Sequence, residues 1–193
     1  MSKTNVKKQL IDAAYKVFVE KGFTDASIRD IAKEAGIRSG LVYYYFKTKD
    51  EILIAVQVDT QERYHQFYAT QAGRTHDLRT DLHEIRSRII DNPDWYRWRY
   101  ELYALSLRRV DLQSEVASVL EQGRQSLQKY LAYLLPDDNN ASDLAGILIA
   151  CFDGLALQAL VDDSFKIDEA YTLLAELIEI YVSKHTQEGG RNE

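Results

Sequence analysis

The sequence predicts an all-α fold, and three observations support that prediction. Only two of the 193 residues are proline, so long helices can run without interruption. Apolar residues recur three and four positions apart over most of the chain, which is helical spacing. No stretch alternates between apolar and polar residues for long enough to require a β-strand.

The first 50 residues predict three helices, of which the last two are short. A first amphipathic helix is expected over residues 4–21, where a glycine ends it. Ser27 is a good N-cap for a second helix, Gly36 follows its end, and a third helix starts near Arg38 or Ser39. Two short helices joined by a glycine turn form a helix-turn-helix, whose second helix lies in the major groove of DNA.

The third helix has an apolar side and a side left for DNA. Val42 and Phe46 lie four residues apart and therefore anchor one side. Gly40 inside a helix costs about 1 kcal/mol relative to alanine, so we expect a compensating close approach to the sugar-phosphate backbone; the alternative is a tight N-terminal turn. Exposed tyrosines can bind phosphates or contact thymine methyl groups. The outward residues are Ser39, Gly40, Tyr43 and Tyr44.

The charge distribution favours nucleic-acid binding at the N-terminal end alone. Residues 1–49 hold ten Lys or Arg against five Asp or Glu, a balance of +5. Residues 50–193 hold 14 against 25, a balance of −11, and the two balances give the net charge of −6. The basic end attracts phosphate and the acidic remainder repels it, so we expect an affinity for DNA that falls steeply with salt.

These first 50 residues closely resemble the DNA-binding domain of the TetR family of bacterial transcriptional regulators. The motif runs from the first helix through Ser27 to Tyr43-Tyr44-Tyr45-Phe46-Lys47-Thr48-Lys49-Asp50-Glu51. The resemblance implies that Lys49 starts the next helix and binds a phosphate. Leu41 departs from the polar residue of many relatives, which favours apolar contact with thymine or no direct readout. The resemblance implies DNA contacts at Ser27, Ser39, Gly40, Leu41, Tyr43, Tyr44 and Lys49, and the nearby cations Arg38 and Lys47 are further candidates.

The remaining chain predicts a second, larger helical domain, so we expect a DNA-binding domain over 1–49 and an effector-binding and dimerisation domain over 50–188. A long helix leaves the first domain, and Pro93 opens an aromatic helix after Asn92. The expected helices cover residues 50–72, 78–91, the segment after Pro93, 114–135, 141–162 and 168–185.

The last two expected helices predict a homodimer. Residues 144–152 are apolar all round, so we expect their helix to be buried on several sides. A membrane span is the alternative, but the uninterrupted run is short of the roughly 20 residues required. We expect the two helices to pair with their symmetry copies as a four-helix bundle, as the resemblance also implies; the alternative is a monomer. The expected interface residues are Leu148, Leu155, Leu174, Leu177, Ile178 and Tyr181.

Residues 95–103 form the densest aromatic cluster and suggest a small-molecule site. Aromatic walls with a few hydroxyl groups are typical of such sites, although ordinary core packing is the alternative. Acids such as Glu101 would suit a cation or a planar amphipathic molecule. The stretch 153–160 is similar to the choline-responsive repressor type, which does not identify the ligand. The expected effector-binding residues are Tyr64, Phe67, Tyr68, Trp95, Trp98, Tyr103 and Phe152.

The sequence offers little for catalysis. Glu62 and His65 have the spacing of di-iron bundles, but no second copy of that motif exists. No metal-like histidine spacing, phosphate loop or nucleophile elbow is present, so we expect no catalytic residue, metal or cofactor. A helical adaptor that does not bind DNA is a third class. The single cysteine, Cys151, and the absence of an apolar leader at the first residues indicate a cytoplasmic protein.

These observations predict a transcriptional regulator with double-stranded operator DNA, a second copy of itself and an unknown small-molecule effector as partners. We expect a repressor whose homodimer binds a palindromic operator. A ligand that favours a wider spacing of the two recognition helices would release it from DNA.

Overall fold

The computed structural model describes residues 3–69, 77–135 and 140–189, and these residues form nine α-helices and no strand. The predicted all-α fold is therefore confirmed. The chain divides into two compact units, Met1–Thr75 and His76–Glu193. The predicted functional division at residues 49 and 50 differs from this structural one and stays a prediction.

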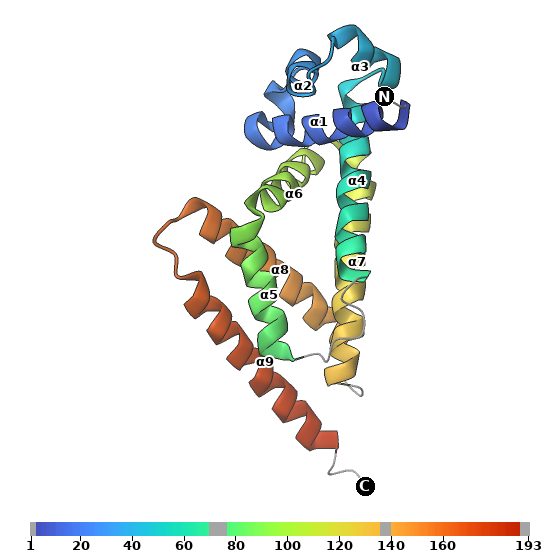
Figure 1. Cartoon of the computed structure of the whole chain (residues 1–193). Helices are drawn as coiled ribbons and strands as arrows, with labels where there is room; N and C mark the ends of the chain where they lie inside the picture. The colour runs from blue at the N-terminus through green and yellow to red at the C-terminus, as the bar shows by residue number, and fades with distance from the viewer. Residues whose placement is uncertain (1–2, 70–76, 136–139, 190–193) are drawn as a thin grey trace. The chain divides into compact units, whose positions relative to one another are not determined.

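The first unit holds four helices around a small apolar core (Figure 1). Helix α1 packs on both α2 and α4, and α2 packs on α3. The helices are α1 (Lys3–Asp25), α2 (Ile28–Glu34), α3 (Ser39–Tyr45) and α4 (Lys49–Ala69). Almost no solvent reaches the side chains of Leu10, Phe18, Ile31, Val42, Ile52, Leu53 and Val56.

Two glycines shape the turns of this unit. Gly36 has φ +64°, a conformation that favours glycine, and it follows the Ala35 C-cap of α2 as predicted. Gly22 has φ 75° and ψ 158°, but helical structure resumes beyond it and α1 reaches Asp25. The predicted break of the first helix at Gly22 is therefore present, and α1 continues beyond this kink as a short helical segment to Asp25.

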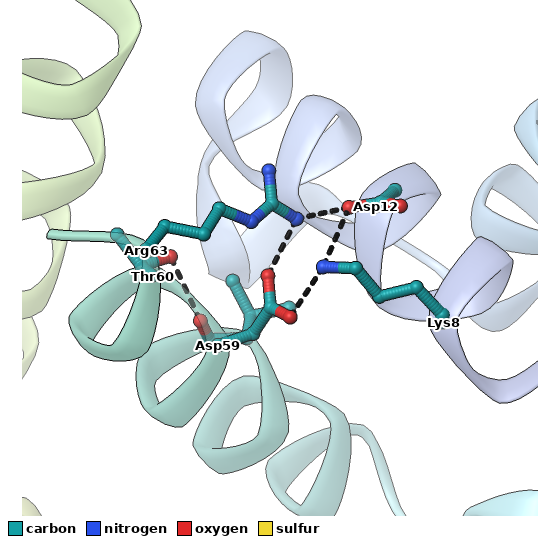
Figure 2. Close-up of polar contacts among 6 residues, drawn as sticks. Lys8, Asp12, Asp59, Thr60 and Arg63 are labelled. Atoms are coloured by element: carbon teal, nitrogen blue, oxygen red, sulfur yellow. Dashed lines mark hydrogen bonds and ion pairs between the residues drawn. The ribbon is translucent and has the colours of Figure 1, made fainter. Parts of the chain in front are cut away.

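An ion-pair cluster joins the later part of α4 to α1 (Figure 2). Asp59 pairs with Lys8 and with Arg63, whose guanidinium lies 2.5 Å from the Asp59 carboxylate. Arg63 also pairs with Asp12, and Lys8 lies 3.3 Å from the same Asp12 carboxylate. Partial burial alone would lower the pKa of Arg63, but the charges of Asp59 and Asp12 raise it above its ordinary value.

The second unit holds the other five helices (Figure 1). Helix α5 packs on α6, α8 and α9; α7 packs on α6 and α8; and α8 packs on both α6 and α9. The helices are α5 (Leu78–Asp91), α6 (Pro93–Ser106), α7 (Val110–Leu134), α8 (Ala141–Val161) and α9 (Ile167–Gly189). Pro93 occupies the first turn of α6, as predicted, whereas α7 begins four residues before the expected start at 114.

Helix α8 buries one face only, although its sequence predicts burial on several sides. Its buried residues recur at helical spacing and contribute to the core of this unit, whereas Ile147, Leu157 and Val161 are exposed. Within the described residues, α8 is the helix whose length and hydropathy would suffice to cross a membrane. A core helix with an apolar outer face has the same composition. The buried positions are Ala141, Ala145, Leu148, Phe152 and Ala156.

Candidate nucleic-acid interface and effector region

Helix α3 is anchored on one side and uncovered on the other within the first unit. Val42 and Phe46 are buried, as their four-residue spacing predicts. The side chains of Leu41, Tyr43 and Tyr44 are 40, 51 and 58% exposed. The neighbouring Arg38 and Gly40 are exposed as well, and Ser39 is half-buried. The structure thus gathers the predicted contacts of this helix on one accessible side.

Among the described residues of the first unit, no contact requires a glycine at position 40. A Cβ atom built on Gly40 would meet no heavy atom within 4 Å, and the backbone there does not have a positive φ. The cost of a glycine in a helix is therefore not compensated by packing within the described residues. Close approach of another molecule would explain it, as the sequence predicts.

Ser27 is exposed but is used for capping. Its hydroxyl accepts from the Asp30 backbone N–H at 3.1 Å and donates to the Asp30 carboxylate at 2.5 Å. Asp30 accepts in return from the Ser27 backbone N–H, which completes a capping box. Hydrogen bonds from Lys21 and Ser27 hold the pKa of Asp30 well below its ordinary value. The structure confirms Ser27 as the N-cap, and a DNA contact at this residue stays a prediction.

The two lysines beside α4 differ in their surroundings. Lys47 is exposed, and its ammonium donates to the Tyr43 carbonyl at 3.2 Å. Lys49 donates to three backbone carbonyls, those of Phe23, Thr24 and Ala26, and the phosphate contact that the resemblance implies for it stays a prediction. The position of Lys49 in the sequence does not indicate these partners, because they are main-chain atoms at the end of α1 and in its link with α2.

In the second unit, α6 and α8 meet around Arg99, which the sequence analysis does not predict as a site residue. Arg99 pairs with Asp153 through two contacts of 2.9 and 3.2 Å, and both side chains are mostly buried. The Arg99 guanidinium also lies 5.1 Å from the ring centres of Trp95 and Tyr103. Tyr103 donates to the Asp153 carboxylate, and Tyr100 donates to the Asp153 carbonyl at 2.6 Å.

This cluster revises the predicted chemistry of the region. The aromatic faces and the carboxylate that could attract a cationic ligand hold Arg99 instead. A signal for Arg99 was available, since Trp95, Arg99 and Tyr103 are successive at four-residue spacing and share one helix face. Burial raises the pKa of Tyr103 above its ordinary value, so its hydroxyl stays neutral and can donate.

The predicted effector residues fall into three groups. Trp98 and Phe152 are buried, and Trp98 is among the most fully buried large side chains, so core packing accounts for it. Trp95 and Tyr103 are half-buried beside Arg99. The side chains of Tyr64, Phe67 and Tyr68 lie outside the described residues, so their predicted role stays a prediction.

Tyr171 on α9 is a buried polar residue that the sequence analysis does not predict as a site residue. It is 5% exposed, and its ring stacks on Phe152 with centroids 6.3 Å apart. Among the described residues, no hydrogen-bond partner reaches its hydroxyl. Burial raises the pKa of Tyr171 above its ordinary value, so the hydroxyl remains neutral. An unsatisfied buried hydroxyl costs free energy that an acceptor on a ligand or a water would recover.

The predicted dimer residues divide between the core and the surface. Leu148 and Ile178 are buried in the core of their own unit, and Leu155, Leu174 and Tyr181 are partly buried. Leu177 is 56% exposed. The apolar residues that α8 and α9 leave exposed are Ile147, Leu157, Val161, Leu173, Leu177 and Ile180. We name these six residues the α8–α9 apolar face.

Both units match known families. The family described as bacterial regulatory proteins, tetR family, matches residues 10–56, and the tetracyclin repressor-like C-terminal domain matches residues 73–180. The chain is 28% identical to the HTH-type transcriptional regulator PksA of Bacillus subtilis over 162 residues, 81% of this chain and 79% of that protein. It is 25% identical to the HTH-type transcriptional repressor NicS of Pseudomonas putida over 178 residues, 92% of this chain and 76% of that protein.

A solved structure supports the same fold over nearly the whole chain. A transcriptional regulator from Saccharomonospora viridis in complex with choline superposes with a TM-score of 0.72 at 20% identity, covering 92% of this chain and 97% of that one. The second family match alone spans more than half of the chain. The chain therefore belongs to the TetR family, whose members are transcriptional regulators with a DNA-binding helix-turn-helix.

Proposed function

We propose that this regulator is a cytoplasmic repressor whose homodimer binds a palindromic operator through α3 and leaves it when a small molecule occupies the second unit. The observation that carries this proposal is the accessible side of α3, where Leu41, Tyr43 and Tyr44 remain exposed beside Gly40. The proposed DNA contacts are Ser27, Arg38, Ser39, Gly40, Leu41, Tyr43, Tyr44, Lys47 and Lys49.

The homodimer is supported by the α8–α9 apolar face. These six large apolar residues are exposed on two helices that contact each other, and a single chain leaves them in water. A two-fold pairing of this face would bury it and would place two copies of α3 for two half-sites. The predicted contributions of Leu148 and Ile178 to this interface are small, because both side chains are already buried.

Effector release is supported by the polar interior of the second unit and by one solved neighbour. The buried Tyr171 hydroxyl can donate to an acceptor on a ligand. That neighbour contains choline, which is an example of a small molecule bound by a protein of this fold. Repression, rather than activation, is also what the name of NicS states for that relative.

The test begins with a duplex selected from a randomised pool by the purified full-length chain. We expect binding of this duplex to weaken steeply with salt, since phosphate contacts release counterions. Failure of the chain to enrich any duplex would support the adaptor alternative. Native mass spectrometry of the purified protein then identifies any co-purified molecule, and equal affinity for the duplex with and without that molecule bound would refute effector release.

A further inference from the structure

Helix α3 carries none of the side chains that form paired hydrogen bonds with DNA bases. Arginine and lysine recognise guanine through such pairs, and asparagine and glutamine recognise adenine in the same way. The sequence of α3, Ser-Gly-Leu-Val-Tyr-Tyr-Tyr, contains none of these four residue types. The nearest is Arg38, the exposed residue that precedes the helix. Base recognition by α3 itself therefore has to use other contacts.

The first turn of α3 exposes one large side chain. In a helix-turn-helix, the first residues of the second helix contact the base edges. In α3 these residues are Ser39, Gly40 and Leu41. Ser39 is half-buried and Gly40 has no side chain, whereas Leu41 is exposed. The next residue, Val42, is fully buried and anchors the helix on the core of the unit. Leu41 is therefore the largest exposed group of the turn that meets the bases.

The chemistry of leucine limits what Leu41 can recognise. Its side chain has no hydrogen-bonding atom, so against a phosphate or a polar base edge it would displace water without replacing the lost hydrogen bonds, which costs free energy. The apolar group that the major groove displays is the C5 methyl of thymine. Gly40 beside it leaves room for close approach, because a Cβ atom there would meet no heavy atom within 4 Å. A thymine methyl is thus the group that suits Leu41.

The exposed tyrosines of α3 suit a different task. Leu41 and Tyr44 lie three residues apart and share one side of the helix. The Tyr44 ring meets the Tyr45 ring edge-on, with centroids 5.1 Å apart, so it extends the apolar surface beside Leu41. The hydroxyl groups of Tyr43 and Tyr44 can bind phosphates, which fix the register of a protein on DNA and carry no sequence information. The tyrosines can position α3, and Leu41 is left to distinguish bases.

We propose that Leu41 is a specificity-determining residue, which recognises the methyl group of a thymine in each half-site of the operator. This inference rests on the proposed binding of a palindromic operator through α3. Recognition of this kind distinguishes thymine from uracil, because the two bases differ only in the C5 methyl. It also requires the leucine side chain, so the effect of the methyl and the effect of Leu41 should depend on each other.

The test replaces each thymine of the selected duplex in turn by deoxyuridine, at matching positions of both half-sites. Burial of a methyl group is worth about 0.8 kcal/mol, so wild type should lose about fourfold in affinity per half-site at one thymine position. Folded Leu41→Ala should bind the unmodified duplex more weakly and should lose this distinction. The control Val58→Ala, at an exposed apolar residue of α4, should keep it. Equal affinity of wild type for every duplex, or the same methyl effect in Leu41→Ala, would overturn the proposal.

A second measurement uses wild type alone and so does not depend on the folding of a variant. At the thymine position identified, the T·A pair is replaced by C·G and by the same pair with 5-methylcytosine, which restores the methyl. We expect the methylated duplex to bind about fourfold more tightly per half-site, and equal binding of the two would contradict methyl recognition. If the chain enriches no duplex, the proposed function fails and this inference with it. An enriched duplex whose thymine methyls have no effect would refute this inference alone.

Discussion

Replacement of Gly40 by alanine should stabilise the protein and weaken its binding to DNA. The new methyl group would meet no heavy atom within 4 Å, and the backbone at Gly40 has no positive φ, so folding meets no steric cost. Alanine restricts the unfolded chain and favours the helix, which should add about 0.4–1 kcal/mol to the free energy of unfolding. The same methyl lies on the side of α3 that we assign to DNA, where it should reduce affinity about tenfold or more, roughly 1.4 kcal/mol.

Gly36→Ala is the matched control for this change. A Cβ atom at Gly36 would also meet nothing within 4 Å, but the residue has φ +64°. Alanine in that left-handed conformation should cost about 1–2 kcal/mol. The two substitutions therefore add the same methyl group to equally open positions and should change stability in opposite directions.

The assay combines urea unfolding with binding of the selected duplex by fluorescence anisotropy. Both tryptophans, Trp95 and Trp98, belong to the second unit, so their fluorescence reports that unit, whereas far-ultraviolet circular dichroism reports all helices. Changes confined to the dichroism transition can thus be assigned to the first unit. Wild-type affinity in a stabilised Gly40→Ala protein would refute close approach of DNA at this position. A destabilised Gly40→Ala protein would refute the helical conformation assigned to it.

Three further predictions address the ion pairs, the dimer and the pH dependence. Asp59→Asn should lower the free energy of unfolding by about 1 kcal/mol, since Lys8 and Arg63 lose a shared partner. Urea titration at low salt and at molar salt checks this prediction. An equal loss of stability at the two salt concentrations would contradict an ionic cause. Leu177→Glu should yield monomers in sedimentation experiments. The control Leu107→Glu changes a more exposed apolar residue outside the α8–α9 apolar face and should remain dimeric. A dimeric Leu177→Glu protein would place the interface elsewhere. The folded-state pKa of Asp30 is lowered, so wild type should be more stable than Asp30→Asn. This difference in the free energy of unfolding should be complete above the ordinary pKa of 3.8 and should decline as the pH falls below it, as followed by urea titration from neutral pH to about pH 3. A difference that does not depend on pH would refute this linkage.

The helix-turn-helix could be predicted from the sequence because its signals are local. The Ser27 cap, the Gly36 turn and the four-residue spacing of Val42 and Phe46 each act within one or two helical turns, and the structure has all three. The same spacing rule identified the side of α3 that stays exposed.

Which residues face the core of the second unit could not be predicted in this way. The apolar residues of α8 surround the helix, so periodicity alone does not separate Leu148, which is buried, from Ile147, which is exposed. Leu177 and Ile178 on α9 divide in the same manner. The choice depends on where neighbouring helices pack, and this arrangement is not encoded in the period of a single helix.

The sequence by itself therefore determined the all-α class and the recognition helix, since short-range hydrogen bonds and helical periodicity specify them, and the resemblance of its first 50 residues indicated the family. Only the tertiary structure decided what Lys49, Arg99 and Tyr171 contact. Arg99 meets Asp153 across 54 positions, and Lys49 meets carbonyl oxygens that every residue type carries. Such partners are selected by the packing of distant helices, because a backbone acceptor has no signature in the amino-acid sequence.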